Sequence, residues 1–172
     1  MPQRVIGIDP GLRLSGYGAV VVNERAIEPK LIEAGVIRLD GKLPIEQRLD
    51  QLAGDLEQLL VELVPDVMVV EKLYAHYRHP RTAILMAHAR GVILLCAQRC
   101  HIPVAHMPST EIKKALTGYG HASKQQMQHA VASQLNLAEP PSPPDVADAL
   151  AIALTYTRRV AFERLADQGN PA

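Results

Sequence analysis

The sequence predicts an α/β fold with a five-stranded mixed sheet and helices on both of its faces. Three observations lead to this prediction. Three apolar segments with short turns open the chain, the apolar spacing then lengthens to that of a helix, and short, continuously apolar segments afterwards alternate with helical ones. At 172 residues, 48% of them hydrophobic, the chain is long enough for one domain with a sizeable core.

The first three apolar segments predict strands. They cover residues 3–9, 16–23 and 30–39, and their short connections favour an antiparallel meander. The next segment has the apolar spacing of one helix face and is bounded by Pro44 and Pro65. Its apolar positions are Ile45, Leu49, Leu52, Leu56, Leu59 and Leu63.

The rest of the chain predicts two more strands and four more helices. Strands are expected at residues 66–71 and 102–107, and helices at 80–100, at PSTEIKKAL (108–116), at 123–137 and at 143–165. We expect Ser109 or Thr110 to cap the PSTEIKKAL helix. A single domain over residues 1–165 and a short flexible tail over 166–172 follow from this order of elements.

Cysteine usage and hydropathy limit where the protein works. Cys96 and Cys100, four residues apart in a predicted helix, do not make a disulfide framework, so a reducing cytoplasm is expected. The chain has no run of 18 uninterrupted apolar residues and no signal-peptide pattern at its start, so we expect no membrane span.

The charge is unevenly distributed along a chain whose formal net charge is zero. Residues 1–70 hold 7 Lys and Arg against 11 Asp and Glu (−4), residues 71–124 hold 8 against 2 (+6), and residues 125–172 hold 3 against 5 (−2). A basic middle third can give a neutral protein a local positive face; chance clustering on a solvated surface is the alternative.

Carboxylates end two of the predicted buried strands. Asp9 closes the first strand and Glu71 the fourth, so the two emerge side by side if these strands are parallel neighbours. Asp145 and Asp148, three residues apart near the start of the last helix, share a face and could join them. Converging carboxylates repel one another and suit hard cations such as Mg²⁺ or Mn²⁺, so the pattern predicts a divalent-metal site.

Each acid also has a purely structural interpretation. Asp9 suits the first position of a Pro-Gly turn, and Asp148 could be a surface residue. Glu71 could pair with a nearby cation. Asp145 fits a capping box in which Ser142 is the cap and Pro143 the first helical residue.

Cations mixed with aromatic residues follow Glu71. This pattern suits nucleic acid, because cations contact phosphates and rings stack on bases; a solvated loop is the alternative. The expected DNA contacts are Tyr74, Arg78, Arg81, Lys113, Lys114 and Lys124.

Five segments, in order through residues 4–158, resemble the RuvC-type Holliday-junction resolvases. They are GIDPGLRLSGYG, VVEKLY, PRTAILMAHARGV, IKKALTGYGHASKQQ and PDVADALAIAL. The resemblance implies a ribonuclease-H-like fold, a homodimer, and metal-dependent paired nicking of four-way DNA junctions in recombination and repair. It also implies the branch-migration motor proteins of that pathway as partners.

The resemblance assigns roles to individual residues. It puts the family's aromatic beside the junction centre on Tyr74, its phosphate-contacting lysines on Lys113 and Lys124, and its dimer contact on the helix near 80–100. The family's four acidic positions fall on Asp9, Glu71, Asp145 and Asp148. We expect these acids to hold two Mg²⁺ ions, with Mn²⁺ as a possible substitute, and Asp9 to bridge them. Lys124 is expected beside the scissile phosphate, where it stabilises the growing negative charge.

The chain departs from the family pattern at a few positions. Leu73-Tyr74 stands where a Phe or a Phe pair is usual, Ala87-His88 replaces Gly-Gln, and Tyr119 and His121 replace Asn and Arg. These departures bear on sequence preference and on the dimer, whereas all four acids are present.

Three other functions are compatible with parts of the pattern. A nuclease of the same fold could act on another branched or hybrid nucleic acid. A GID-x-G start also opens the nucleotide-binding halves of sugar kinases and chaperone ATPases, but these need a second lobe and phosphate loop. The third is a DNA-binding dimer without catalytic activity.

Overall fold

The computed structural model describes residues 2–23, 28–72 and 80–168. This part of the chain has five strands and five helices: three strands come first, helices and strands then alternate from α1 to β5, and three helices end it. The strands are β1 (Gln3–Asp9), β2 (Leu14–Val22), β3 (Lys30–Arg38), β4 (Val67–Glu71) and β5 (Val104–Met107). The helices are α1 (Ile45–Leu63), α2 (Pro80–Arg99), α3 (Ser109–Thr117), α4 (Lys124–Gln134) and α5 (Pro144–Gln168).

The strands form one mixed sheet in the order β3-β2-β1-β4-β5. The pairs β1–β2 and β2–β3 are antiparallel, which confirms the predicted meander. The pairs β1–β4 and β4–β5 are parallel, and Ile8 lies opposite Val70. Asp9 and Glu71, one residue further on, therefore end neighbouring parallel strands at the same edge of the sheet, as predicted.

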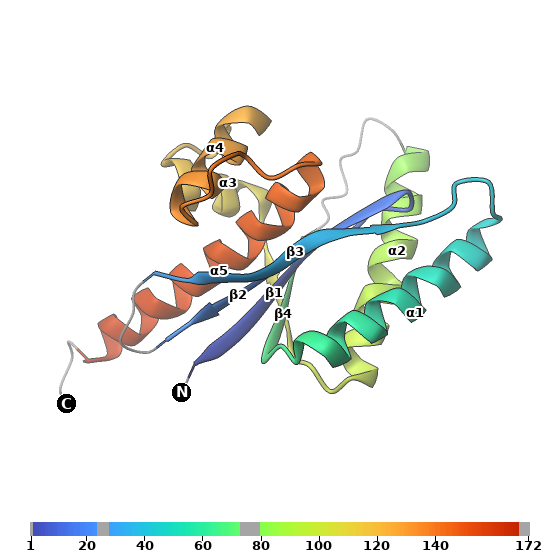
Figure 1. Ribbon diagram of the computed structural model, residues 1–172, viewed down its shortest axis with the longest axis horizontal. Coiled ribbons are helices and arrows are strands. Elements are labelled where there is room, and N and C mark those ends of the chain that lie inside the picture. The colour runs from blue at the N-terminus through green and yellow to red at the C-terminus, as the bar shows by residue number, and fades with distance from the viewer. Residues whose placement is uncertain (1, 24–27, 73–79, 169–172) are drawn as a thin grey trace.

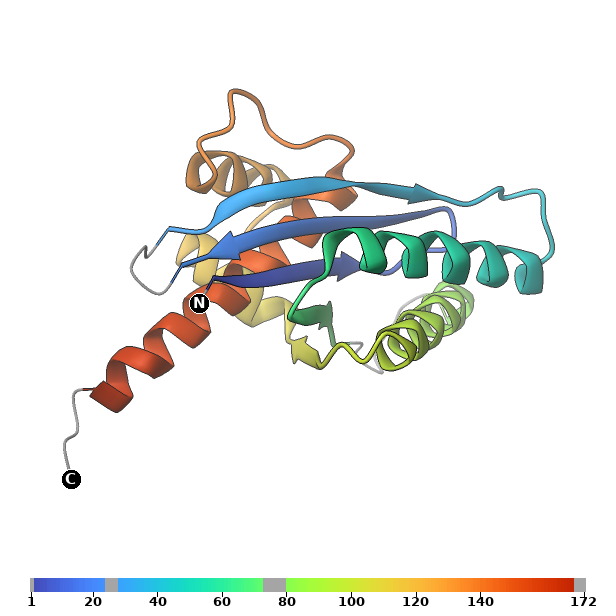
Figure 2. The same ribbon diagram turned by 60° about the horizontal axis from the view of Figure 1, so that its bottom comes forward.

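Helices cover both faces of the sheet (Figures 1 and 2). One core lies between the sheet and the helices α1 and α2, and it includes Ile6 and Ile8 of β1 and Met68 and Val70 of β4. The other core lies between the sheet and the helices α3, α4 and α5, and it includes Val5 of β1. The predicted α/β fold with a five-stranded mixed sheet is confirmed.

The face of α1 that packs on the sheet is the one that the sequence spacing predicts. Leu52, Leu56, Leu59 and Leu63 are buried. Ile45 and Leu49 are partly buried against the same core. The helix ends where Val64 takes a left-handed conformation (φ 45°) and its N–H bonds to the Leu60 carbonyl, just before Pro65.

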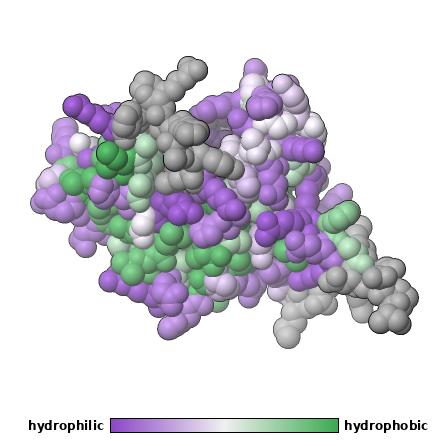
Figure 3. All heavy atoms as spheres, turned by 180° about the vertical axis from the view of Figure 1, so that it is seen from behind, coloured by the Kyte–Doolittle hydropathy of each residue, from purple (hydrophilic) through white to green (hydrophobic). Residues whose placement is uncertain are grey.

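The helix α2 buries one side and leaves apolar residues exposed on another. Ala89, Ile93 and Cys96 are fully buried, whereas Ile84 and Leu95 are 56% and 48% exposed. Both line a hollow of about 500 Å³ between α2 and α1. Seen from behind, green apolar atoms gather on the side of the molecule where α2 lies (Figure 3). This apolar face of α2 has no partner within the part of the chain described here.

The helix α5 crosses the sheet and continues beyond it, as Figure 1 shows. Every residue from Ala149 to Leu154 is buried, which explains the nearly continuous apolar sequence DALAIAL. Beyond the sheet the helix is largely exposed, and Phe162 is 76% exposed. In the described ranges no helix is long and apolar enough to cross a membrane.

Several predicted boundaries differ from the structure. The strand β2 begins at Leu14, β5 begins at Val104, and α4 ends at Gln134. The helix α5 reaches Gln168, so residues 166–168, expected as part of a flexible tail, are helical, while 169–172 lie outside the described residues. Helix ends are set by local competition between turn and helix, which apolar spacing does not record.

Two capping predictions are also wrong. Pro108 is the N-cap of α3, so Ser109 is the first helical residue and Thr110 the second. The helix α5 begins at Pro144 and not at Pro143. The two cysteines are free, with Cys96 buried and Cys100 half-buried, as expected from the absence of a disulfide framework.

Candidate active site

The alternation of side chains along β1 and β4 directs both strand-end acids to the same face. Val5 of β1 and Val67 and Val69 of β4 belong to the core beneath α5. Successive residues of a strand point to opposite faces, so Asp9 and Glu71 point to the side of α5 as well. Neighbouring strand ends on one face therefore bring two carboxylates together beneath the start of α5.

Glycines in the sheet allow α5 to approach closely. Gly16 pairs with Asp9 across the β1–β2 ladder, and a Cβ on Gly16 would collide with the Asp145 carbonyl oxygen. A Cβ on Gly7 would lie 2.8 Å from the Ala153 nitrogen and collide with the backbone of the preceding turn of α5. The backbone of α5 thus rests directly on β1 and β2, with its first turn beside Asp9.

The pKa of Asp9 reflects how close the other acids lie to it. The pKa of Asp9 is raised from 3.8 to about 8, first by burial and then by the charges of Asp148, Glu71 and Asp145, in that order. Lys124 acts in the opposite direction and lowers this pKa. The four acids found by sequence are therefore close enough to interact as one cluster.

Glu71 and Asp148 face the same half-buried space. Burial raises the pKa of each, and Asp148 also raises the pKa of Glu71. Lys113 lowers the pKa of both, and the Ser109 hydroxyl lowers that of Glu71 by hydrogen bonding. A cavity of about 180 Å³ opens between these four residues and Lys124.

Arg90 of α2 holds the end of β4 from the opposite face of the sheet. Its Nε donates to the Glu71 carbonyl oxygen at 3.2 Å, and its Nη2 lies 2.8 Å from His106 Nδ1 on β5. Burial, followed by the charges of Arg90 and Lys72, lowers the pKa of His106, which favours the neutral ring that can accept this bond. Arg90 thus fixes the backbone that carries Glu71 to β5 from the face of the sheet that α2 covers.

The cluster has the donor chemistry of a divalent-metal site. Four carboxylates interact here beside Lys113 and Lys124, and carboxylate oxygens are the ligands that Mg²⁺ and Mn²⁺ prefer. In residues 2–23, 28–72 and 80–168, however, no three His, Cys, Asp or Glu side chains are already arranged around one point as metal ligands. The residue types fit a divalent metal, although their side chains do not form a ready-made set of ligands in this described part of the chain.

The predicted DNA contacts divide into three groups. Lys113 and Lys124 act on the acids and line their cavity. Lys114 and Arg81 are exposed on α3 and at the start of α2. Tyr74 and Arg78 lie outside the described residues.

Three residues that support the site were not singled out for this role by the sequence. The signal for Gly16 would have been its spacing: it lies two residues from Gly18 in the same strand, so both glycines are on the same face of the sheet. Ser109 was expected only as a helix cap. Arg90 carries no signal in a single sequence, because its partners are 16 and 19 residues away.

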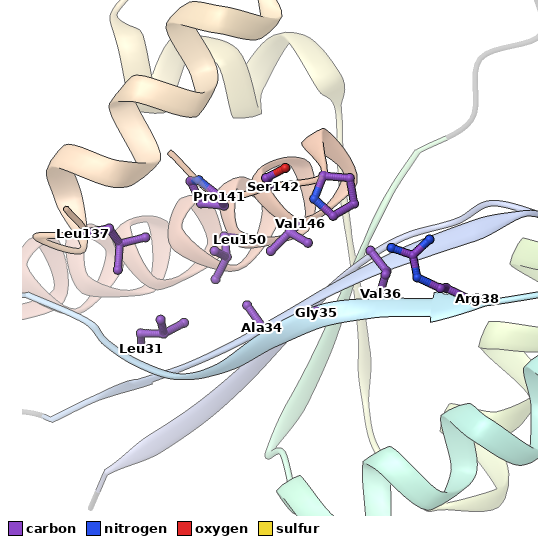
Figure 4. A pocket seen from close by; sticks show the side chains of 11 residues that line it. Leu31, Ala34, Gly35, Val36, Arg38, Leu137, Pro141, Ser142, Val146 and Leu150 are labelled. Carbon is purple, nitrogen blue, oxygen red and sulfur yellow. The ribbon is translucent and has the colours of Figure 1, made fainter. Parts of the chain in front are cut away.

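A larger apolar cavity lies on the other side of the start of α5 and does not belong to the acid cluster. It measures about 360 Å³ and lies between β3 and the segment that leads into α5, where Leu31, Ala34, Pro141 and Val146 face one another (Figure 4). Arg38, at the end of β3, lies at its margin (Figure 4).

Comparison with known proteins gives consistent matches along almost the whole chain. The family model for crossover junction endodeoxyribonuclease RuvC matches residues 5–156. The protein of that name from Rhodopirellula baltica is 45% identical over 150 residues, 87% of this chain and 83% of that protein. The one from Synechococcus is 42% identical over 153 residues, 89% of this chain and 97% of that protein.

Solved structures of related proteins agree with these sequence matches. Thermus thermophilus RuvC in complex with a Holliday junction substrate superposes with a TM-score of 0.84 at 33% identity, covering 92% of this chain and 97% of that one. The yeast mitochondrial Holliday junction resolvase Ydc2 superposes with a TM-score of 0.67 at 15% identity, covering 96% and 84% of the two chains; this second likeness concerns the fold alone.

Proposed function

The chain belongs to the RuvC family of crossover junction endodeoxyribonucleases, and we propose that it resolves four-way DNA junctions at the acidic edge of its sheet. The observation that carries the proposal is the convergence of Asp9, Glu71 and Asp148, whose charges act on one another where β1, β4 and α5 meet. The likeness to a relative solved with a Holliday junction substrate supports the choice of DNA.

The four acids are the metal ligands of this proposal. Asp9, Glu71, Asp145 and Asp148 would hold two Mg²⁺ ions, which Mn²⁺ could replace. When bound, such ions activate the attacking water and stabilise the leaving oxygen of a phosphodiester. Asp9 ends the central strand β1, and the charges of all three other acids act on it, so it would be the acid best placed to hold both ions.

The lysines around the cluster bind the phosphate that is cut. Lys124 acts on Asp9 and Asp148, and we place its ammonium group beside the scissile phosphate, where it stabilises the negative charge that develops. Lys113, which acts on Glu71, contacts the same strand. The exposed Lys114 and Arg81 contact phosphates further along the DNA, and Tyr74 and Arg78 remain predicted contacts.

A homodimer forms through the apolar face of α2. Two symmetric cuts require two sites, and a two-fold dimer presents them to a junction that is itself nearly two-fold symmetric. The exposed Ile84 and Leu95, together with the hollow beside them, support this surface as the contact. The branch-migration motor proteins of the same pathway are the protein partners in this proposal.

A nicking assay tests the proposed function. The protein is incubated with Mg²⁺ and an immobile synthetic four-way junction, with linear duplex and RNA–DNA hybrid of the same sequence alongside. Paired, symmetric nicks in the junction alone are expected. Cleavage of the hybrid alone would indicate a nuclease of the same fold that acts on another nucleic acid. No cleavage of any substrate would contradict the proposed nuclease function.

A further inference from the structure

An exposed aromatic pair occupies the turn between α3 and α4. The rings of Tyr119 and His121 meet edge to face, with centroids 5.7 Å apart and planes at 66°. Tyr119 is 59% exposed, so much of its ring is open to solvent in a chain that has no Trp and one Phe. Edge-to-face contact fixes the orientation of a ring and leaves a face available for stacking.

The turn itself is held firmly by hydrogen bonds. The Thr117 hydroxyl accepts from the Tyr119 N–H at 3.2 Å and lies 2.7 Å from the Lys113 carbonyl oxygen, to which it can donate. Gly118 takes the left-handed conformation that ends α3 (φ 77°), and Ser123 starts α4 with a capping box. The aromatic pair is therefore positioned before any ligand arrives, which lowers the entropic cost of binding.

The turn borders the acid cluster. It connects the helix that carries Lys113 to the helix that begins at Lys124, and both lysines line the cavity beside the acids. Gly120 lies against the first turn of α3, where its Cβ would be 3.6 Å from the Thr110 carbonyl oxygen. Thr110 follows Ser109, which lines the same cavity.

A ring on the turn that joins these two lysine-bearing helices suits one kind of ligand. When lysines hold the backbone of a nucleic-acid strand, its bases are within reach of aromatic side chains nearby, and base–aromatic stacking works with any base. We propose that Tyr119, braced by His121, is a stacking platform for a nucleobase of the DNA strand held by Lys113 and Lys124. This inference rests on the proposed function, since it takes DNA as the ligand.

Fluorescence of 2-aminopurine tests the platform. The base is placed in turn at each nucleotide flanking the cut in a four-way junction, and the full-length protein is titrated in metal-free buffer so that no cleavage occurs. Stacking quenches 2-aminopurine, so we expect quenching at one of these positions with the unaltered protein and with Tyr119→Phe. Tyr119→Ala should abolish the quenching and weaken junction binding by roughly 5- to 100-fold.

A matched control separates the platform from general loss of an exposed ring. Phe162→Ala removes a ring that is 76% exposed on the far part of α5 and should leave quenching and affinity unchanged. Thermal unfolding confirms that the variants are folded. Equal affinity and quenching for Tyr119→Ala and the unaltered protein would overturn the platform, as would a Tyr119→Phe variant that loses as much as Tyr119→Ala.

The nicking assay with the unaltered protein keeps the two proposals apart. If that protein nicks the junction but Tyr119→Ala binds and quenches normally, the platform alone fails. If the unaltered protein neither binds nor nicks the junction, the proposed function fails, and the platform fails with it.

Discussion

Gly16 of β2 and Asp145 of α5 are in backbone contact, directly beside Asp9. A methyl group on Gly16 would strike the Asp145 carbonyl oxygen and lie 3.2 Å from the Asp145 Cβ. The absence of a side chain at one strand position therefore determines how closely two of the four acids approach the other two.

Gly16→Ala should displace the start of α5 and impair the acid cluster. We expect a loss of stability of about 1–3 kcal/mol from overpacking, and a higher Mg²⁺ concentration for half-maximal junction cleavage. Gly54→Ala is the control, because the structure leaves its Cβ free of any atom within 4 Å on α1. That variant should gain about 0.5–1 kcal/mol of helix stability without a change in Mg²⁺ dependence. Identical metal dependence in both variants would argue against a role of Gly16 in positioning the acids.

Arg90→Ala should loosen the end of β4 that carries Glu71. It removes the donor to the Glu71 carbonyl and leaves His106 without its partner, so junction cleavage should fall by roughly tenfold at low Mg²⁺ and recover partly at high Mg²⁺. Arg90→Lys cannot make both bonds from one planar group and should be intermediate. Arg99→Ala, which breaks an exposed pair with Glu57, should behave as the unaltered protein does. A Mg²⁺-independent loss in Arg90→Ala would mean that Arg90 serves overall stability alone.

The metal-free protein should become less stable as the pH rises. The folded-state pKa of Asp9, about 8, lies above its ordinary value of 3.8, so Asp9 binds its proton more tightly in the folded than in the unfolded chain. The stability that this difference contributes is fully present below the ordinary pKa of 3.8, and it is lost progressively as the pH rises to about 8, the folded-state pKa. The raised pKa values of Glu71 and Asp148 act in the same direction.

Asp9→Asn removes this penalty and is therefore expected to raise the melting temperature of the metal-free protein at pH 8, with an effect of about 2 kcal/mol after partial screening by solvent. Thermal unfolding between pH 5 and pH 8 in a chelating buffer measures both effects. If the stability of the unaltered protein stays constant over this pH range, the folded-state pKa values of the acids are not raised, which would contradict this prediction.

Lys124 and Lys114 should differ in the step that they affect. Lys124 acts on Asp9 and Asp148, so Lys124→Ala should lower the cleavage rate of bound junction by about 10²-fold. Lys114 is exposed on α3, so Lys114→Ala should weaken binding and reduce the salt slope by about one counter-ion while leaving the rate at saturation unchanged. Single-turnover rates at saturating protein separate the two, and equal rates for both variants would remove Lys124 from the chemistry.

Much of the fold followed from local patterns. The stripe Leu52, Leu56, Leu59 and Leu63 made α1 recognisable, and the continuously apolar β4 indicated a strand covered on both faces. The strand-end positions of Asp9 and Glu71 were informative because a sheet brings the carboxyl ends of parallel neighbours to one edge.

Other features depend on contacts that no local pattern records. The hydrogen bond from Arg90 to the Glu71 carbonyl joins residues 19 positions apart, and it forms only when α2 packs on the sheet. Gly16 and Asp145 lie far apart in the sequence, so no local pattern shows that they are in contact, even though the glycine itself can be read in the sequence. The predicted start of α5 was one residue before its actual start at Pro144, because several neighbouring prolines and serines could each begin the helix.

The most direct test of this account is the rate of junction cleavage by Asp9→Asn with saturating Mg²⁺. The substitution keeps the size of the side chain and removes the charge of the acid that interacts with all three others. We expect a folded protein that still binds the four-way junction and cleaves it at least roughly 10³-fold more slowly, in line with the several kcal/mol that bound metal contributes. Cleavage of the junction at the normal rate by folded Asp9→Asn would contradict the central claim that these acids form the catalytic metal site.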